Sequence, residues 1–216
     1  NLLEIAGSTN INTTAATNHV YINLNESLVF PNTNNTGTEG MYFLGASRFM
    51  HNYGLRNTWL GSLAGNLSLT VVTAINNTGI GYDALGLIST GHDNLAAGKS
   101  AGSSLHTGNF NVFLGSESGA AGLGNVHCVA VGYNTLADDQ TSFDIVAIGS
   151  NALATSNGSN SCVAIGKNSQ TLVSVASYNT SCGHDTLSAI DTGSFNTVYG
   201  YSSGSNLTLA DGCNVL

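Results

Sequence analysis

The stretch at residues 129–166 reads VAVGYNTLADDQTSFDIVAIGSNALATSNGSNSCVAIG and holds three copies of one pattern. In each copy, a short run of small and β-branched residues ends in a glycine, and these glycines are 17 residues apart. The spacing extends over eight positions: Gly81, Gly98, Gly115, Gly132, Gly149, Gly166, Gly183 and Gly200. A fixed period of this kind is typical of a solenoid, in which one small unit stacks on itself.

The residues just before each glycine predict a β-strand. β-Branched residues dominate the columns one and three residues before the glycine, as in Val146, Ile148, Val163 and Ile165. Residues two apart share a face of a strand, so we expect these two columns to be buried. A period of 17 is too short for two amphipathic helices. The predicted fold is all-β, a parallel β-solenoid with about nine coils in residues 57–216.

Residues 1–56 are less regular, although VYINLN at residues 20–25 alternates like a strand. We expect this part to form a strand-rich cap or connector, because the open end of a stack must be covered. The chain begins without Met and ends inside a repeat. We therefore expect a piece of a longer protein that continues beyond residue 216.

Three other columns carry structural information. Asp, Asn and Ser dominate two residues after the glycine, which predicts a turn. Three residues after it every side chain is small, and we expect this column to let chains pack closely together. The column four residues before the glycine is rich in asparagine, whose amides either hydrogen-bond along the stack or merely tolerate a turn. Those asparagines are Asn57, Asn77, Asn94, Asn111, Asn179 and Asn196.

Composition narrows the functional classes. The formal net charge is -8, with 12 acidic and only 4 basic residues. So few cations cannot neutralise a row of phosphates, which argues against nucleic-acid binding. No apolar run approaches the roughly 20 residues that cross a bilayer, so we expect no membrane insertion by this segment.

The segments at residues 49–65 (FMHNYGLRNTWLGSLAG), 144–159 (DIVAIGSNALATSNGS) and 161–170 (SCVAIGKNSQ) resemble the NxVAIGxxAL repeats of trimeric extracellular fibres. Such repeats occur in the heads of trimeric autotransporter adhesins and in phage-type tail fibres. The resemblance covers about residues 41–216. It implies a left-handed parallel β-roll, three chains side by side, and a role in attachment at a cell or virion surface.

Physical reasoning also favours association. A 17-residue coil encloses little volume, so a lone roll buries a small fraction of its surface. We expect a homotrimer with cyclic symmetry, packed through the column of small residues. The predicted function is non-enzymatic: a structural and adhesive segment that displays a surface to a glycan or protein receptor.

The column directly after the glycine is the candidate ligand strip, because aromatic and hydrogen-bonding groups there suit sugars or a protein receptor. Exposed tyrosines that simply suit a strand, or an interface between chains, would explain the column equally well. The candidate residues are Tyr82, Lys99, Tyr133, Lys167, His184 and Tyr201.

We expect no cofactor, metal or catalytic residue. Cys128 and Cys162 are two coils apart, roughly 10 Å by strand stacking, which is too far for a disulfide. The cysteines are interpreted as buried free thiols, with bonds between chains as the alternative and a metal site as a third. Asp138, Asp139 and Asp144 could hold calcium, but adjacent acids in a loop are more often solvated.

Two rival functions stay open. A flat solenoid with regular threonines can bind ice or a polysaccharide, although the threonines here are scattered. Stretches such as IGYDA and IGSNA are also similar to the hexads of left-handed β-helix acyltransferases. Those enzymes need three hexads in each coil, and only one face of this coil matches.

Overall fold

The computed structural model describes residues 10–14, 19–23, 41–44, 46–67 and 73–215. The chain divides into two compact units, Asn1–Pro31 and Asn32–Leu216. In the first unit, β1 (Asn10–Thr14) pairs antiparallel with β2 (His19–Asn23). The predicted strand at residues 20–25 overlaps β2, and its last two residues lie outside the described part. The described residues contain no helix, and accordingly none that could span a membrane.

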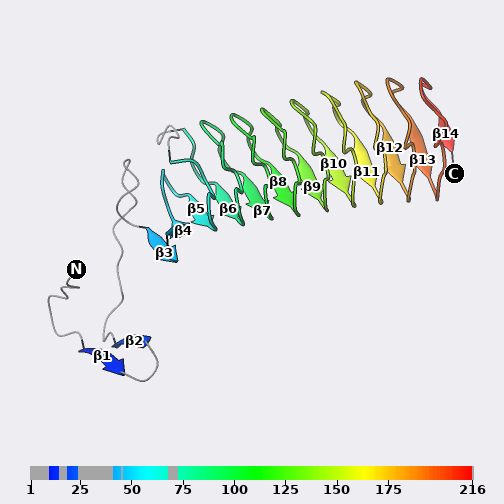
Figure 1. Cartoon of the computed structure of the whole chain (residues 1–216). Coiled ribbons are helices and arrows are strands. Elements are labelled where there is room, and N and C mark those ends of the chain that lie inside the picture. The colour runs from blue at the N-terminus through cyan, green and yellow to red at the C-terminus, as the bar shows by residue number, and fades with distance from the viewer. Residues whose placement is uncertain (1–9, 15–18, 24–40, 45, 68–72, 216) are drawn as a thin grey trace. The chain divides into compact units, whose positions relative to one another are not determined.

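The second unit is built on one twelve-stranded sheet (Figure 1). It opens with an antiparallel pair, β3 (Tyr42–Leu44) and β4 (Ser47–His51), and β4 pairs antiparallel with β5 (Thr58–Leu60). All later pairs are parallel. The remaining strands are β6 (Thr78–Ile80), β7 (Leu95–Ala97), β8 (Val112–Leu114), β9 (Val129–Val131), β10 (Val146–Ile148), β11 (Val163–Ile165), β12 (Thr180–Cys182), β13 (Thr197–Tyr199) and β14 (Asn214–Val215).

The predicted parallel solenoid is confirmed, and its period is visible in the strand register. Val146 pairs with Val163 and Ile148 with Ile165, so residues 17 apart lie side by side. Backbone hydrogen bonds also join successive coils outside the strands, as from the Leu136 amide to the Ala152 carbonyl at 3.0 Å. Each coil is therefore held to its neighbour along both its strand and its return loop (Figure 1).

The predicted inward face of the strand is wrong. The fully buried residue is the one two before the glycine, for example Ala130, Ala147 and Ala164, whereas Ile148 and Ile165 are 38% exposed on the outside. The interior of a 17-residue coil is narrow, so it takes the small side chain and leaves the branched ones outside. We call the columns one and three residues before the glycine the outer sheet face.

The predicted role of the small-residue column is also wrong. Ala84, Ala101, Ser118, Thr135 and Ala152 are fully buried inside their own coils, so this column cannot pack against another chain. Its small side chains fit because the coil turns back on itself there. These side chains are small because they pack inside their own coil, and not because two chains meet there.

The two largest fully buried side chains, both aromatic, lie where glycines leave room. Trp59 and Phe113 are fully buried. A Cβ atom on Gly119 would lie 2.8 Å from the Phe113 ring, and one on Gly65 would lie within 2.3 Å of the Trp59 ring. Four other coils instead hold a buried leucine four residues after the column glycine, at Leu85, Leu136, Leu153 and Leu187.

The predicted turn after the glycine is confirmed by backbone geometry. The residue two after the glycine is left-handed, as in Asp83 at φ 58°, Asn134 at φ 52° and Asn151 at φ 57°. Short polar side chains tolerate this conformation because they bond to the local backbone. The turn directs the next residue into the core.

Candidate functional site

The candidate ligand strip forms a straight line along the outside of the array. Tyr82, Tyr133 and Tyr201 are 51%, 55% and 76% exposed. The rings of His184 and Tyr201 stack with centroids 5.4 Å apart, and Lys99 Nζ lies 3.9 Å from a Glu117 carboxylate oxygen. Lys167 lies in the same column. The structure therefore aligns these residues, with serines at Ser116 and Ser150 between them, but does not gather them into a pocket.

A second exposed feature is the outer sheet face. It presents aliphatic side chains at nearly every level of the array, and these side chains are half-exposed or exposed. Its members include Ile80, Leu95, Val112, Leu114, Val129, Val131, Val146, Ile148, Val163 and Ile165. Such a continuous apolar surface is unusual on a protein that stays alone in water.

A third feature borders that face and was missed in the sequence. The residue five before each glycine is left-handed and exposed or half-buried, and several of these residues are aromatic. Tyr178 and Phe195 stack with centroids 4.9 Å apart and ring planes 4° from parallel, and Phe110 lies edge-on to His92 at 5.1 Å. The sequence does contain a signal for this feature, because an aromatic residue, Phe195, follows Tyr178 after 17 residues. The Asp, Asn and Ser residues at other positions of the same column obscure the pattern.

A shallow groove lies beside this aromatic column near the start of the array. Its volume is about 450 Å³, and Asn76, Asp93, Leu95, Phe110 and Val112 are among its lining residues. The hydrogen bond between His92 and Asp93 holds the pKa of the Asp93 carboxyl below its usual value, with a smaller effect from Asn76. The groove thus offers an aromatic ring beside a carboxylate.

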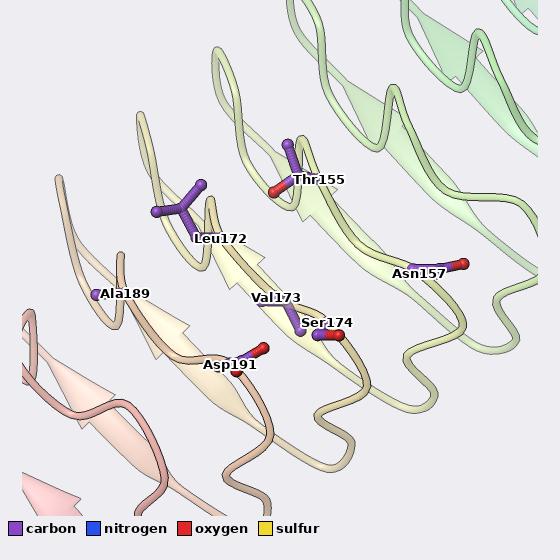
Figure 2. Close-up of a pocket in the computed structure, with 7 residues that line it drawn as sticks. All are labelled: Thr155, Asn157, Leu172, Val173, Ser174, Ala189 and Asp191. Carbon is purple, nitrogen blue, oxygen red and sulfur yellow. The ribbon is translucent and has the colours of Figure 1, made fainter.

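The opposite side of the array holds an open depression of about 400 Å³ (Figure 2). It spans three successive coils, and equivalent positions line it: Thr155, Leu172 and Ala189, then Asn157, Ser174 and Asp191, with Val173 below. Figure 2 shows Leu172 and Thr155 directed away from the ribbon and the polar residues further along each loop.

Within a single chain the four cysteines form no disulfide. Burial raises the pKa of Cys128 to about 12 and that of Cys162 to about 11. Both therefore stay protonated near neutral pH, and a protonated thiol is a poor nucleophile and metal ligand. Cys182 differs from the expectation: it lies on the outer sheet face and is half-buried.

The acidic residues considered for calcium do not meet. Asp139 is fully buried inside the coil, whereas Asp138 and Asp144 are exposed. Among the residues whose placement is described, no three His, Cys, Asp or Glu side chains come close enough to hold a metal ion. The loop turns the Asp139 side chain into the coil and the Asp138 and Asp144 side chains out to solvent, so the three carboxylates point in different directions.

The asparagine column resolves the choice between a hydrogen-bonded ladder and a tolerant turn. Asn94 Nδ2 donates to Asn77 Oδ1 at 2.9 Å, and Asn111 Nδ2 donates to Asn94 Oδ1 at 2.9 Å. These amides are buried, so the column is a structural spine and presents no binding surface.

The architecture is thus a β-solenoid of stacked coils that is compatible with the fold of repeat fibres. Comparison with protein-family models, with curated proteins and with solved structures found no match for this chain.

Proposed function

We propose that this chain is a non-enzymatic structural and adhesive segment of a trimeric extracellular fibre. The observation that carries the proposal is the outer sheet face, an apolar strip that runs along the parallel strands. Burying it against other chains would remove its aliphatic side chains from water, at about 25 cal/mol for each Å². In a cyclic assembly, equivalent coils of the different chains lie at the same height along the axis. The outer sheet face of every chain can then make the same contacts.

The ligand strip would then serve attachment. Tyrosines offer an apolar ring and a hydroxyl that bind sugars or protein surfaces well. In this proposal, the outer sheet face joins the chains and the exposed tyrosines contact the receptor. An extracellular location suits the composition, in which asparagine, serine and threonine replace charge at the surface.

Sedimentation equilibrium tests the assembly. We expect the full chain to sediment with the mass of three chains of 22.0 kDa. The double substitution Ile148→Lys and Ile165→Lys places two charges on the outer sheet face and should yield a monomer. The matched control is Leu172→Lys with Val175→Lys, at two exposed apolar positions on the other side of the coil. The proposal fails if the wild-type chain is a monomer or if both double variants dissociate equally.

Glycan-array and cell-binding measurements test the attachment role. Replacing Tyr82, Tyr133 and Tyr201 by Ser should abolish binding and leave the sedimentation mass unchanged. The same chain should show no thermal hysteresis and no acyl-CoA turnover. Thermal hysteresis would favour the ice- or polysaccharide-binding alternative, and turnover would favour an acyltransferase.

A further inference from the structure

The core of each coil is closed by two interdigitating positions, seven and ten residues after the glycine. In the early coils a large apolar side chain fills the first position and glycine the second. A Cβ atom on Gly91 would lie 2.6 Å from Ile88 Cδ1, and one on Gly108 would lie 2.5 Å from Leu105 Cδ1. Ile88 and Leu105 are both fully buried. This pairing leaves a dry, filled interior.

In three successive coils the same pair of positions becomes polar. The pairs are Gly122 with Asn125, Asp139 with Ser142, and Ser156 with Ser159. All five non-glycine side chains are fully buried. The apolar pairing then returns with Val173 and Ala176, and with Ile190 and Gly193. One section of an otherwise apolar core is therefore polar.

Five atoms of this section have no hydrogen-bond partner within the protein: Asn125 Nδ2, Asp139 Oδ2, Ser142 Oγ, Ser156 Oγ and Ser159 Oγ. The Ser142 hydroxyl lies close enough to the Asp139 carboxyl to influence it, but without the geometry of a hydrogen bond. A buried polar atom without a partner costs about 1–3 kcal/mol, so a group of them needs an explanation.

The hydrogen bonds that are present determine which atoms are left without a partner. Asp139 Oδ1 accepts hydrogen bonds from the backbone amides of Thr141 at 3.2 Å and Gly158 at 3.4 Å, which leaves Oδ2 free. Asn125 Oδ1 accepts one from the Ser142 amide at 3.0 Å, so Nδ2 is the free end. A Cβ on Gly122 would lie 2.6 Å from that Nδ2, so the amide points where Gly122 has no side chain.

We propose that this polar section, bounded by Gly122, Asn125, Asp139, Ser156 and Ser159, is an internal binding site for ordered water. Water donates and accepts hydrogen bonds, and buried water typically makes two to four of them. The free atoms include a donor amide, an acceptor carboxylate and three hydroxyls that can donate or accept. A cation is a poorer match, because the amide of Asn125 directs hydrogen atoms into the same space.

The ionisable groups around the site are few. Cys128 and Cys162 are buried beside it, and the charge of Asp139 contributes to raising the pKa of both thiols. Asp144 contributes to the shift of Cys128 only. Asp139 is the only carboxyl inside the section. Water bound there would hydrogen-bond to Asp139 Oδ2, which has no partner in the protein.

Magnetic relaxation dispersion of ¹⁷O water, measured on the full chain, tests the proposal because it counts long-lived internal water. The variant Asp139→Ile with Ser142→Gly copies the dry pair Ile88 and Gly91, and should lower the dispersion amplitude by at least half. The matched control is Val173→Ile with Ala176→Gly, which changes an already dry coil and should leave the amplitude unchanged. Equal amplitudes in the wild type and the Asp139→Ile variant would overturn the proposal.

A second measurement covers the case in which the double variant does not fold. The near-isosteric variant Asp139→Asn keeps the polar lining and should retain the wild-type amplitude. A high-resolution crystal structure of the wild-type chain should show ordered water within hydrogen-bond distance of Asp139 Oδ2. Clear density for these side chains with no water between them would equally refute the site.

Discussion

The glycines that set the repeat are required by contact between backbones as well as by dihedral angle. Gly149 has a φ of 129°, and a Cβ atom there would lie 2.5 Å from the carbonyl oxygen of Gly166. Gly158 also has a positive φ, of 86°, but its nearest neighbour would be 4.0 Å away. The two positions therefore separate the cost of close approach from the cost of the dihedral.

We expect Gly149→Ala to destabilise the array by about 3 kcal/mol or more, because strain in the backbone adds to a clash that no rotamer relieves. Gly158→Ala should cost only about 1 kcal/mol, from the dihedral alone. Urea unfolding monitored by circular dichroism measures both. Equal losses of stability for the two variants would mean that the close backbone contact at Gly149 adds nothing to the cost of the dihedral angle.

Asp139 makes the stability of the protein depend on pH. Burial raises the pKa of its carboxyl to about 6, against about 3.9 in an unfolded chain. Between these values the folded state binds the proton more tightly, so the contribution of Asp139 to stability falls as pH rises from about 4 to about 6 and is then constant. Burial lowers the pKa of His51 to about 4, which acts in the opposite direction over the same range, so the contribution of Asp139 is read as a difference from Asp139→Asn. Two pKa units correspond to about 3 kcal/mol.

The substitution Asp139→Asn should remove this loss of stability, which chemical unfolding at a series of pH values detects. Asp138→Asn, at the exposed neighbouring carboxyl, should retain the wild-type profile. A wild-type profile that rises from pH 4 to 6 relative to Asp139→Asn would contradict the assignment, because it would require a folded-state pKa below the unfolded value.

Among the structural elements, the asparagine column ties the coils together from within. Asn111 Nδ2 donates to Asn94 Oδ1 and to the Asn125 carbonyl, while Asn111 Oδ1 accepts from the Cys128 amide at 2.9 Å. The side chains of Asn94, Asn111 and Asn196 thus bridge to the coils on either side. Cysteine replaces it at Cys128 and Cys162, where the thiol donates weakly to nearby carbonyls.

Replacing Asn111 by Ala should cost about 3 kcal/mol, because buried groups on two neighbouring coils lose their partners. Asn157→Ala is the control: this asparagine is exposed, and its substitution should change stability by no more than about 0.5 kcal/mol. Thermal unfolding of both variants gives the comparison. If Asn111→Ala were as mild as Asn157→Ala, the ladder would contribute little to stability.

For the molecule as a whole, equal positions meet at every level, so one complete coil is an interchangeable unit. Deleting residues 150–166 joins Gly149 to Lys167 and keeps the register of every later coil. We expect a folded array with one cooperative transition and a urea m-value lower by about one tenth, in proportion to the surface lost. Deleting only residues 150–157 breaks the register and should lower stability far more. Similar behaviour of the two deletions would argue against register as the organising constraint.

Several properties of single residues could not be predicted from the sequence. Leu85, Leu136, Leu153 and Leu187 have positive φ values, between 49° and 52°, which leucine rarely adopts. Complete burial of these side chains offsets the local cost. Asp139 likewise occupies a position where other coils hold Ile88 or Leu105. No local pattern marks such residues, because their conformations follow from the space left by neighbouring coils.

The period of 17 residues and the alternation near Val146 and Val163 were enough to predict the parallel solenoid, because backbone pairing between identical units depends on spacing alone. Which side of the strand faces inward was not predictable from these patterns. Ala147 lies inside and Ile148 outside because the narrow interior limits side-chain volume. This limit on side-chain volume exists only once the coil has closed on itself and stacked on its neighbours. It is therefore set by the tertiary structure and cannot be read from the sequence pattern.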